Sequence, residues 1–514
     1  MNKTYLKNSL SSSGIKNFFW PIRRTFVENV NHNLLKDFTV LSTKYDELHA
    51  TLPIIEKWLI PEVLKIIQAI KLRKFLPKKK LFISMQNYPI LQNLMDNNLL
   101  NYGDNFLSAF IKQPKDMNIP FFFKRIIRTT QKNNFRQLIN IKTKNDHFLE
   151  PNKLALQHAS NKDIPFIYTN VKKIINLSKS NSSLNSKSVE NLLNVILNNI
   201  KKELKGNLEI IDVQIIEYLR KLITEAVKIT LDKVNIVEKE KNCNNLWVGS
   251  SGANYFVKII CHTFRRGDSK IIAHSHGSGY AMVDLLHTFH AVELNTCDKF
   301  YTEKTINSDV LSRDININYL NSMKRPNIGV VNKNNSKIKV NNFSLKKKIK
   351  KIMYIATAYH SERLRFVPVE SDTTYIDFQL RLFSFLKKKN MELFYKPHPE
   401  GSLKFHKELS EFTGVKLLGG FFEEIKVEVD AYVLDQCCTS LLVPLLNIRK
   451  PVFFFNFCYP RLRLNAIKLL KKRMYFIESD LDSNNRVSVN WEKFSDLLNV
   501  EHHQFSDEFL KTFY

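Results

Sequence analysis

The pattern of apolar and polar positions divides the chain near residue 240. From about Asn31 to Phe75, apolar residues recur three and four positions apart, which is the spacing of an amphipathic helix, and the segment leads into the basic run LPKKK. A Ser/Asn-rich stretch then passes into a second helical pattern, in INLSKSNSSLNSKSVENLLNVILNNIKKELKG, which marks a junction or insertion near residues 175–190. The sequence therefore predicts a mostly helical N-terminal region over residues 1–175.

Beyond residue 240, short apolar runs alternate with helical stretches. The runs NLWVGS, SKIIAHSHGSG and DKFYTEK are separated by GANYFVKIICHTFRR and YAMVDLLHTFHAVEL, whose apolar residues have helical spacing. Strands that alternate with helices are typical of a parallel α/β sheet. We therefore expect a first α/β domain, on the acceptor side, over residues 176–330, with a helical insertion.

A second α/β domain is predicted over residues 351–514. It follows a polar and strongly basic stretch, residues 331–350, which we interpret as the connection between the domains. Apolar runs separated by helical patterns then predict a Rossmann-like, nucleotide-binding sheet. The predicted strands are Lys351–Thr357, Met391–Pro397, VKLLG, Asp430–Asp435 and Pro451–Asn456.

The composition is that of a folded and basic protein. With 514 residues, of which 44% are hydrophobic, the chain can bury a full core in about two to four domains. Lys and Arg number 78 against 49 Asp and Glu, which gives a formal net charge of +29. Such a charge favours a polyanionic neighbour, namely nucleic acid, an anionic membrane surface or a phosphorylated substrate. The abundant Lys, Asn, Ile and Phe leave compositional bias as the alternative explanation.

The cysteines and the amino-terminal segment bear on the compartment. The six cysteines show no C-x-x-C spacing, so neither a zinc site nor a disulfide framework is indicated, and a reducing compartment fits. The first residues lack the uninterrupted apolar stretch and the small-residue cleavage site of a secretion signal. No run approaches the ~20 apolar residues of a spanning helix. We therefore expect a soluble or peripherally attached protein.

Three unusual sequences follow predicted strands of the second domain. KPHPEG, DQCCTSLL and TAYHSER each begin where an apolar run ends. Because ligands of doubly wound sheets bind at the carboxyl ends of the strands, this coincidence predicts a binding site. Arg363 and Arg365 lie just past the first strand, and their guanidinium groups suit the phosphates of a donor.

His398 stands between two prolines, Pro397 and Pro399, at the end of a predicted strand. The prolines fix the backbone and remove two competing donors, so the imidazole is aimed with little conformational freedom. Such a ring is suited to hydrogen-bond a phosphate, and Lys396 flanks it. An ordinary surface or core histidine is the competing interpretation.

Thr439 and Ser440 stand where a helix is predicted to begin. Hydroxyl side chains at a helix N-terminus, together with the free amides and the helix dipole, form a cradle for phosphate. The competing interpretation is a simple N-cap, which uses the same residue types.

The turn HSHGSG, residues 274–279, is the corresponding candidate in the first domain. Gly277 and Gly279 let the backbone approach a ligand closely, and His274 or His276 has the chemistry of a general base or a sugar contact. The turn is not a G-x-G-x-x-G fingerprint, and no G-x-x-x-x-G-K-[ST] occurs in the chain. A turn with incidental histidines is the alternative.

Taken in order, these motifs resemble those of the bacterial surface-carbohydrate transferases of GT-B architecture. That group includes capsule transferases, CMP-sialic-acid sialyltransferases and CDP-glycerol glycerophosphotransferases. The resemblance covers about residues 245–514 and says little about the region before it. Its residues are the H-G turn, the histidine-proline pair and the D-x-x-x-x-D segment with a hydroxyl pair and K-P after it: His276, Gly277, His398, Pro399, Asp430, Asp435, Thr439, Ser440, Lys450 and Pro451.

The resemblance implies a fold and an activity. The fold is α/β and GT-B-like, with two Rossmann-like domains facing a central cleft and a helical N-terminal extension. The activity is transfer of a sugar or polyol phosphate from a CMP-, CDP- or UDP-linked donor to a surface polysaccharide or lipid-linked acceptor. In that group the histidine-proline motif and the hydroxyl pair grip the nucleotide phosphate, which here corresponds to His398, Pro399, Thr439 and Ser440.

An inverting transfer also needs a base for the acceptor hydroxyl. His276 or His274 is the candidate, with Asp284 and Glu293 as acidic alternatives, because the sequence lacks the acidic pair followed by glycine that serves the sialyltransferases. The one D-x-D triplet in the chain, Asp480-Leu481-Asp482, lies outside the motifs that carry the resemblance, so the metal motif of GT-A enzymes is not assigned. We therefore expect a metal-independent reaction, with no cofactor beyond the nucleotide-activated substrate.

Two other functions stay open from the sequence. A nucleotide-sugar epimerase of the same fold would also hold a uridine diphosphate, and a basic nucleic-acid-binding protein would account for the charge. Because no RRM, zinc-finger or helix-turn-helix signature is present, we expect the charge to serve an anionic membrane or a lipid-linked acceptor. A nonenzymatic structural protein ranks third. The expected location is the cytoplasm, with peripheral attachment at the inner face of the cell membrane.

Overall fold

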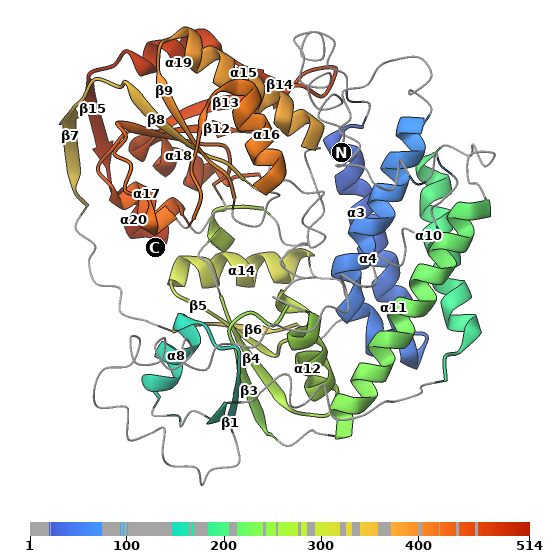
Figure 1. Ribbon diagram of the computed structural model, residues 1–514. Helices are drawn as coiled ribbons and strands as arrows, with labels where there is room; N and C mark the ends of the chain where they lie inside the picture. The colour runs from blue at the N-terminus through green and yellow to red at the C-terminus, as the bar shows by residue number, and fades with distance from the viewer. Residues whose placement is uncertain are drawn as a thin grey trace.

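The computed structural model contains two large β-sheets and a layer of long helices beside the first sheet (Figure 1). Among the helices that the structure describes, none is both long and apolar enough to cross a membrane. The described residues are 20, 22–73, 93, 96, 100, 146–162, 164, 167–168, 183–204, 213–239, 243–252, 255–275, 279–284, 293–318, 325–331, 340–357, 372–398, 403–420, 422–437, 441–457 and 461–513.

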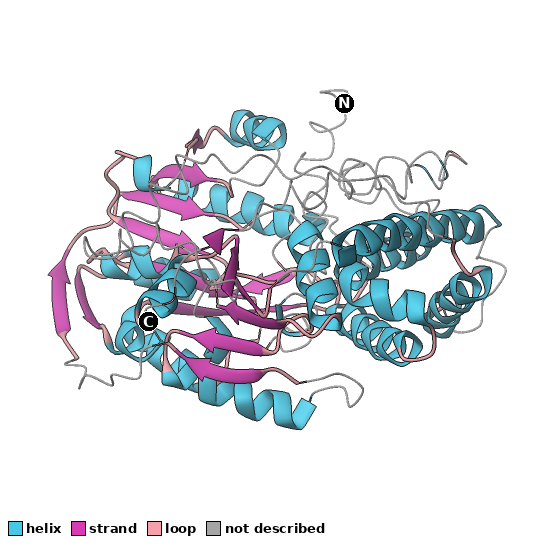
Figure 2. Ribbon diagram, turned by 90° about the horizontal axis from the view of Figure 1, so that it is seen from below, coloured by secondary structure: helices cyan, strands magenta, loops and turns pink. Residues whose placement is uncertain are grey.

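Four long helices form the helical layer: α3 (Arg24–Ser42), α4 (Asp46–Arg73), α10 (Ser186–Glu203) and α11 (Val213–Lys239). They pack side by side, α3 on α4, α4 on α11 and α11 on α10 (Figures 1 and 2). Because its neighbours cover it on several sides, α4 is buried along nearly its whole length. The helical prediction between residues 31 and 75 is confirmed over its described residues.

The first sheet has six parallel strands in the order β2-β1-β3-β4-β5-β6. They are β1 (Asp146–Leu149), β2 (Ile167–Tyr168), β3 (Asn245–Val248), β4 (Lys270–His274), β5 (Lys299–Thr302) and β6 (Asn327–Val330). This is the flavodoxin-like order, which reverses between β1 and β3. β1 and β2 precede residue 176, so part of the sheet comes from the region predicted to be mostly helical. Neither strand was predicted, and in β1 only Phe148 and Leu149 are consecutive apolar residues, too few for a pattern.

Helices cover both faces of the first sheet. Alternate residues of a strand point to opposite faces, so Leu246 and Val248 of β3 join the core with α12 (Tyr255–Arg266), whereas Trp247 packs in a small cluster with α8 (Lys153–Ser160). Burial on both faces explains why the strands read as apolar runs without alternation.

The second sheet has seven strands in the order β10-β9-β8-β11-β12-β13-β14, parallel except for the last pair. They are β8 (Lys351–Ile355), β9 (Glu392–Lys396), β10 (Lys416–Leu417), β11 (Ala431–Leu434), β12 (Val452–Asn456), β13 (Tyr475–Leu481) and β14 (Val487–Val489). All five strands predicted from the sequence are confirmed. The six parallel strands, β8 to β13, have the order 3-2-1-4-5-6 of the dinucleotide-binding doubly wound sheet, which reverses between β8 and β11.

Helices again cover both faces of the second sheet. Ile352 and Tyr354 of β8 share a core with α15 (Asp372–Lys388) and α19 (Trp491–Leu498), while Met353 and Ile355 share another with α17 (Leu442–Asn447) and α18 (Leu464–Arg473). The remaining helix of the parallel crossovers is α16 (Leu403–Thr413), between β9 and β10. The mixed α/β class with parallel sheets is therefore confirmed.

The two large sheets meet through segments that follow their carboxyl ends. The segment after β4 includes the short helix η3 (Gly279–Ala281), and Val283 beyond it forms a β-bridge with Leu462, which follows β12. Asp284 N donates to Arg461 O at 2.8 Å, and Arg463 N donates to Met282 O at the same distance. The helix α14 (Thr305–Asn318) adds an ion pair between Asp314 and Arg463.

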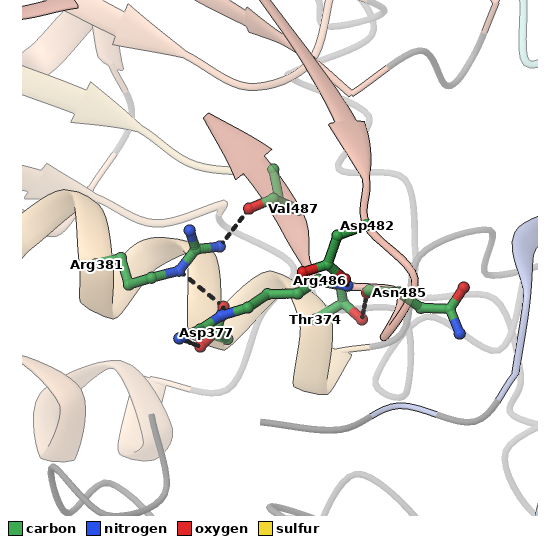
Figure 3. A network of polar contacts seen from close by, with 7 residues as sticks. All are labelled: Thr374, Asp377, Arg381, Asp482, Asn485, Arg486 and Val487. Carbon is green, nitrogen blue, oxygen red and sulfur yellow. Dashed lines mark hydrogen bonds and ion pairs between the residues drawn. The ribbon is translucent and has the colours of Figure 1, made fainter. Parts of the chain in front are cut away.

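The amino end of α3 is tied to the second sheet by the turn between β13 and β14. Trp20 N donates to Asn484 O at 3.2 Å, and Asn485 Nδ2 donates to Trp20 O at 2.5 Å. The turn is itself held on α15, because Arg486 makes two hydrogen bonds of 2.8 and 2.9 Å to the buried carboxylate of Asp377 (Figure 3). Arg381 donates to the same carboxylate and to Val487 O. The segment before α3 is thus fixed to an element more than 400 positions away.

The predicted basic connection contains a strand. β7 (Asn342–Lys346) pairs antiparallel with β15 (His502–Ser506) to form a separate two-stranded sheet. The chain ends near α20 (Glu508–Phe513), which packs on α18.

Candidate functional site

The crevice between β8 and β11 is the place where a doubly wound sheet of this strand order binds its ligand. Thr357 follows β8, His398 follows β9, and Asp435 and Gln436 follow β11. Lys396 is the last residue of β9. The parallel register brings these strand ends to one edge of the sheet. The polar residues that follow the three strands therefore lie close to one another.

Asp435 is a buried carboxylate at the centre of this edge. The hydroxyls of Tyr354 and Tyr375 both donate to its Oδ2, the two hydroxyl oxygens lie 3.0 Å apart, and Gln379 Nε2 donates to Tyr354 at 3.1 Å. Burial raises the pKa of Asp435 to about 6, against the opposing effect of the tyrosine hydrogen bonds. The group can therefore hold or release a proton close to neutral pH.

Thr357 and Gln436 link the turn after β8 to the turn after β11. Thr357 N donates to Tyr375 Oη at 2.8 Å, and Thr357 Oγ1 donates to Gln436 Oε1. Because Tyr375 also holds Asp435, one network fixes the turn after β8, the turn after β11 and the first turns of α15 together. Such a network prepares the geometry of a binding site before a ligand arrives.

Lys396 and His398 bring cationic chemistry to the same edge. Lys396 is buried and its Nζ donates to Pro397 O at 2.9 Å, while His398 is half-buried. Behind them the ring of His406 contacts Tyr395 Oη through Nδ1 at 2.7 Å. Burial, together with the charges of Lys396 and His398, lowers the pKa of His406 to about 4. A neutral His406 leaves Lys396 and His398 as the groups that suit an anion.

Several of the predicted site residues lie outside the described residues. They are His276, Gly277, Arg363, Arg365, Pro399, Thr439 and Ser440. The roles assigned to these residues stay predictions.

His274 lies inside the first domain. It is the last residue of β4 and is fully buried, its Nδ1 lies 3.0 Å from Val248 O, and its Nε2 lies 2.9 Å from Nδ1 of His158. Since a carbonyl only accepts, His274 donates through Nδ1 and accepts from His158 through Nε2. Burial lowers the pKa of His274 to about 3 and that of His158 to about 4. Both ring nitrogens of His274 are thus engaged within the protein.

A second buried carboxylate, Glu293, joins the turns after β3 and β4. Ser250 Oγ donates to Glu293 Oε1 at 2.7 Å, the hydroxyl of Tyr280 donates to Oε2, and Ser251 Oγ donates to the main-chain oxygen at 2.5 Å. Burial and the charge of Glu293 raise the pKa of Tyr280 well above its usual range. Of the two acidic alternatives, Glu293 is thus built into this edge, whereas the Asp284 side chain is exposed.

Gly249 marks where the strand order of the first sheet reverses. A Cβ at Gly249 would lie 2.8 Å from Asn152 N and 2.9 Å from Glu150 O, so only glycine permits this approach of the turns after β1 and β3. Asn152 in turn donates to Ser275 O at 2.8 Å. Gly279 begins η3, and its carbonyl accepts from Met282 N at 3.0 Å.

Sequence reasoning missed the supporting residues of both edges. Tyr354, Tyr375 and Gln379 meet Asp435 only after the sheet and α15 have packed, and Asn152 and His158 follow the unpredicted β1. Of the residues that support these edges, Glu293 was named from the sequence, as an acidic alternative within the apolar run HAVEL. Among the described residues, no group of three or more His, Cys, Asp or Glu is placed to hold a metal ion.

No protein-family model matches this chain, and no curated protein sequence matches it.

Proposed function

We propose that the protein is a transferase that moves a sugar or polyol phosphate from a CMP-, CDP- or UDP-linked donor to a surface polysaccharide or lipid-linked acceptor. The observation that carries the proposal is the meeting of the two sheets. The β-bridge between Val283 and Leu462 joins segments that follow the carboxyl ends of β4 and β12. Ligand sites of parallel sheets lie at those ends, so a donor on one sheet and an acceptor on the other would share one interface.

The donor side of the proposal rests on the second sheet. Its strand order is that of nucleotide-binding sheets, and Lys396 and His398 present cationic chemistry beside the crevice. A departing nucleotide carries its negative charge on the phosphate, which such groups and free amides stabilise. Thr439, Ser440, Arg363 and Arg365 are assigned to the same phosphate on sequence grounds alone.

The acceptor side needs a group that removes the proton of the acceptor hydroxyl. Because both nitrogens of His274 are engaged by Val248 and His158, we assign the base to His276 and give His274 the role of fixing the turn that carries it. Glu293 holds the neighbouring turns through Ser250 and Tyr280. We keep the expectation of a metal-independent reaction, because the one D-x-D triplet, Asp480–Asp482, lies at the end of β13 and in the turn between β13 and β14, where Asp482 accepts hydrogen bonds from the main chain of that turn.

The wider context of the proposal is the inner face of the cell membrane. A net charge of +29 favours approach to anionic lipid, where a lipid-linked acceptor would be found. Nucleic acid is not assigned as a partner, since no recognition motif is present.

The first experiment is a thermal-shift screen of the full chain with CMP, CDP, UDP and GDP. A ligand that binds only the folded protein raises its melting temperature, so one cytidine or uridine nucleotide should produce a shift that grows with concentration. His398→Ala should weaken the binding of that nucleotide by about 1 to 3 kcal/mol, the usual loss for a hydrogen bond to a charged group, and the protein should stay folded. No shift with any nucleotide would remove the proposal.

Product analysis then separates transfer from isomerisation. Incubation with the matching nucleotide sugar and no acceptor should leave the sugar nucleotide unchanged in configuration. An isomerised sugar nucleotide would identify an epimerase instead.

A further inference from the structure

The two-stranded sheet of β7 and β15 lies at the outside of the molecule, and β7 is its outermost strand (Figures 1 and 2). The register of the pair is fixed by two hydrogen bonds beyond the strand ends. Lys347 N donates to Glu501 O at 2.9 Å, and Asp507 N donates to Asn341 O at 3.0 Å. Within the described residues, β7 pairs with no strand other than β15.

This register determines which main-chain groups of β7 face outward. In an antiparallel pair, hydrogen-bonded and non-hydrogen-bonded positions alternate. Since residues 341 and 347 are hydrogen-bonded positions, so are 343 and 345, and the N–H and C=O groups of the residues between them point away from β15. These outward residues are Asn342, Ser344 and Lys346, whose side chains are exposed.

A surface groove of about 680 Å³ is lined by both strands of this small sheet together with α18 and α20. Polar and apolar strand residues line it together, and its lining also includes Lys472 of α18 and Glu508 of α20, which form an ion pair of 2.5 Å. An added strand would place alternate side chains toward the groove. The lining residues are Val340, Asn342, Phe343, Ser344, Lys472, Gln504, Phe505, Ser506 and Glu508.

The exposed charges on β7 and directly after it are positive, whereas the acidic residues Glu501, Asp507 and Glu508 flank β15 on the inner side of the pair. Lys346 and Lys348 are exposed and have no acidic partner in the described part of the chain, and the guanidinium of Arg449 lies 5.5 Å from the ring of Phe343. Lysine on an edge strand discourages pairing with a second copy, because two basic edges would be brought together. An acidic strand meets no such repulsion.

We propose that the outer edge of β7 binds an extended acidic peptide segment of another protein by strand addition. The main chain of the peptide pairs with residues 342, 344 and 346, which supplies affinity, and its alternate side chains contact the groove and the cationic side chains, which supplies specificity. The surface is formed by elements other than the strand ends of the two large sheets, so the proposal stands independently of the transferase activity.

The test uses the full chain and a fluorescent peptide of alternating Glu and Val. Ser344→Pro removes the central outward N–H without removing a hydrogen bond to β15, since proline is accepted at edge positions whose N–H faces solvent. Ser344→Thr keeps that N–H and is the matched control. We expect anisotropy to report binding to the wild type and to Ser344→Thr, and at least about tenfold weaker binding to Ser344→Pro, the effect of losing about 1.4 kcal/mol.

Two further measurements make the outcome decisive should the proline variant fail to fold. Hydrogen exchange of the wild type should show protection of the amides of residues 342, 344 and 346 on peptide addition. The double change Lys346→Glu with Arg449→Glu should lower the affinity for the acidic peptide by at least about tenfold. It should raise the affinity for a peptide of alternating Lys and Val. Absence of binding, unchanged exchange at the three amides, or a dimer of this chain that Ser344→Pro dissociates would overturn the proposal.

Discussion

Single buried ionisable residues support the strand ends of both sheets, and they do so in different protonation states. His274 and His158 are neutral because burial makes their charged forms costly, and one hydrogen bond then passes between them. Asp435 differs, because a buried carboxylate with a pKa of about 6 changes its charge within an accessible pH range. Its effect on stability is therefore measurable.

Asp435 should make the fold less stable as the pH rises. Its pKa in the folded protein, about 6, lies above the ordinary value of 3.8, so the folded protein binds the proton more tightly than the unfolded chain does. That contribution to the free energy of unfolding is complete below about pH 4 and is lost as the pH rises through 6, for a total of about 3 kcal/mol. Asp435→Asn keeps an acceptor for both tyrosine hydroxyls and removes the titration.

Urea unfolding between pH 4 and pH 7.5 checks this prediction. The buried histidines, whose pKa values are lowered, act in the opposite direction, but they are common to both proteins. The difference in unfolding free energy, Asp435→Asn minus wild type, should therefore rise with pH. A difference that stays constant over this range would show that Asp435 does not titrate there.

His158→Ala should destabilise the first domain. The change leaves Nε2 of the buried His274 without its donor, which costs about 1 to 3 kcal/mol, and it also opens a space beside Trp247 and Tyr301. Urea unfolding measures the loss. The exposed His502→Ala is the matched control and should stay within about 0.5 kcal/mol of the wild type. Equal stability of the two variants would contradict the buried histidine pair.

At the scale of elements, the apolar pattern predicts three of the four long helices and most strands of the second sheet, but it misses α11, β13 and β14. Helical spacing revealed α3, α4 and α10, and apolar runs revealed β8, β9, β10, β11 and β12, because both faces of that sheet are covered by helices. β1 and β2 were missed, although β10, with two residues, was predicted from the apolar run VKLLG. β7 alternates exposed and partly exposed residues within a basic stretch, so composition suggested a connection.

The turn between β13 and β14 was also beyond prediction, since its anchors come from α15 and from Trp20. Arg486→Ala would leave the buried Asp377 with Arg381 as its remaining cation and should cost about 2 to 4 kcal/mol, somewhat less than a fully buried pair because Arg486 is partly exposed (Figure 3). Hydrogen exchange should show loss of protection over residues 482–487.

Two controls separate geometry from charge at Arg486. Arg486→Lys keeps the charge but loses the paired hydrogen bonds, so an intermediate loss is expected. Lys471→Ala breaks an exposed ion pair with Glu478 and should cost no more than about 1 kcal/mol. If Arg486→Ala costs no more than Lys471→Ala, the turn is held by other contacts.

At the scale of the whole molecule, two sheets with different strand orders meet at their carboxyl ends. The alternation of strands and helices predicts two α/β units, and the strand-end motifs predict which edges carry chemistry. How the units meet depends on contacts between residues far apart in the sequence, such as Arg463 with Asp314 and Val283 with Leu462, which no local pattern contains. The candidate site was predictable as a set of strand ends, but its supporting network was not.

The separation of the two sheets leads to a prediction about a fragment of residues 340–514. It begins before β7, so the pairing of β7 with β15 is kept, but it lacks Ala281, Met282 and Val283, which complete one of its apolar cores. We expect the fragment to fold with a lower melting temperature than the full chain, because the side chains that these residues cover become exposed.

If the donor nucleotide is held by the second sheet alone, the fragment should bind the nucleotide that raises the melting temperature of the full chain, with similar affinity, and it should transfer nothing. Calorimetry on both proteins tests this, with His398→Ala in the fragment as the control that should lose binding. A folded fragment that ignores a nucleotide bound by the full chain would place the donor site across both sheets, and transfer by the fragment would remove the first sheet from the reaction.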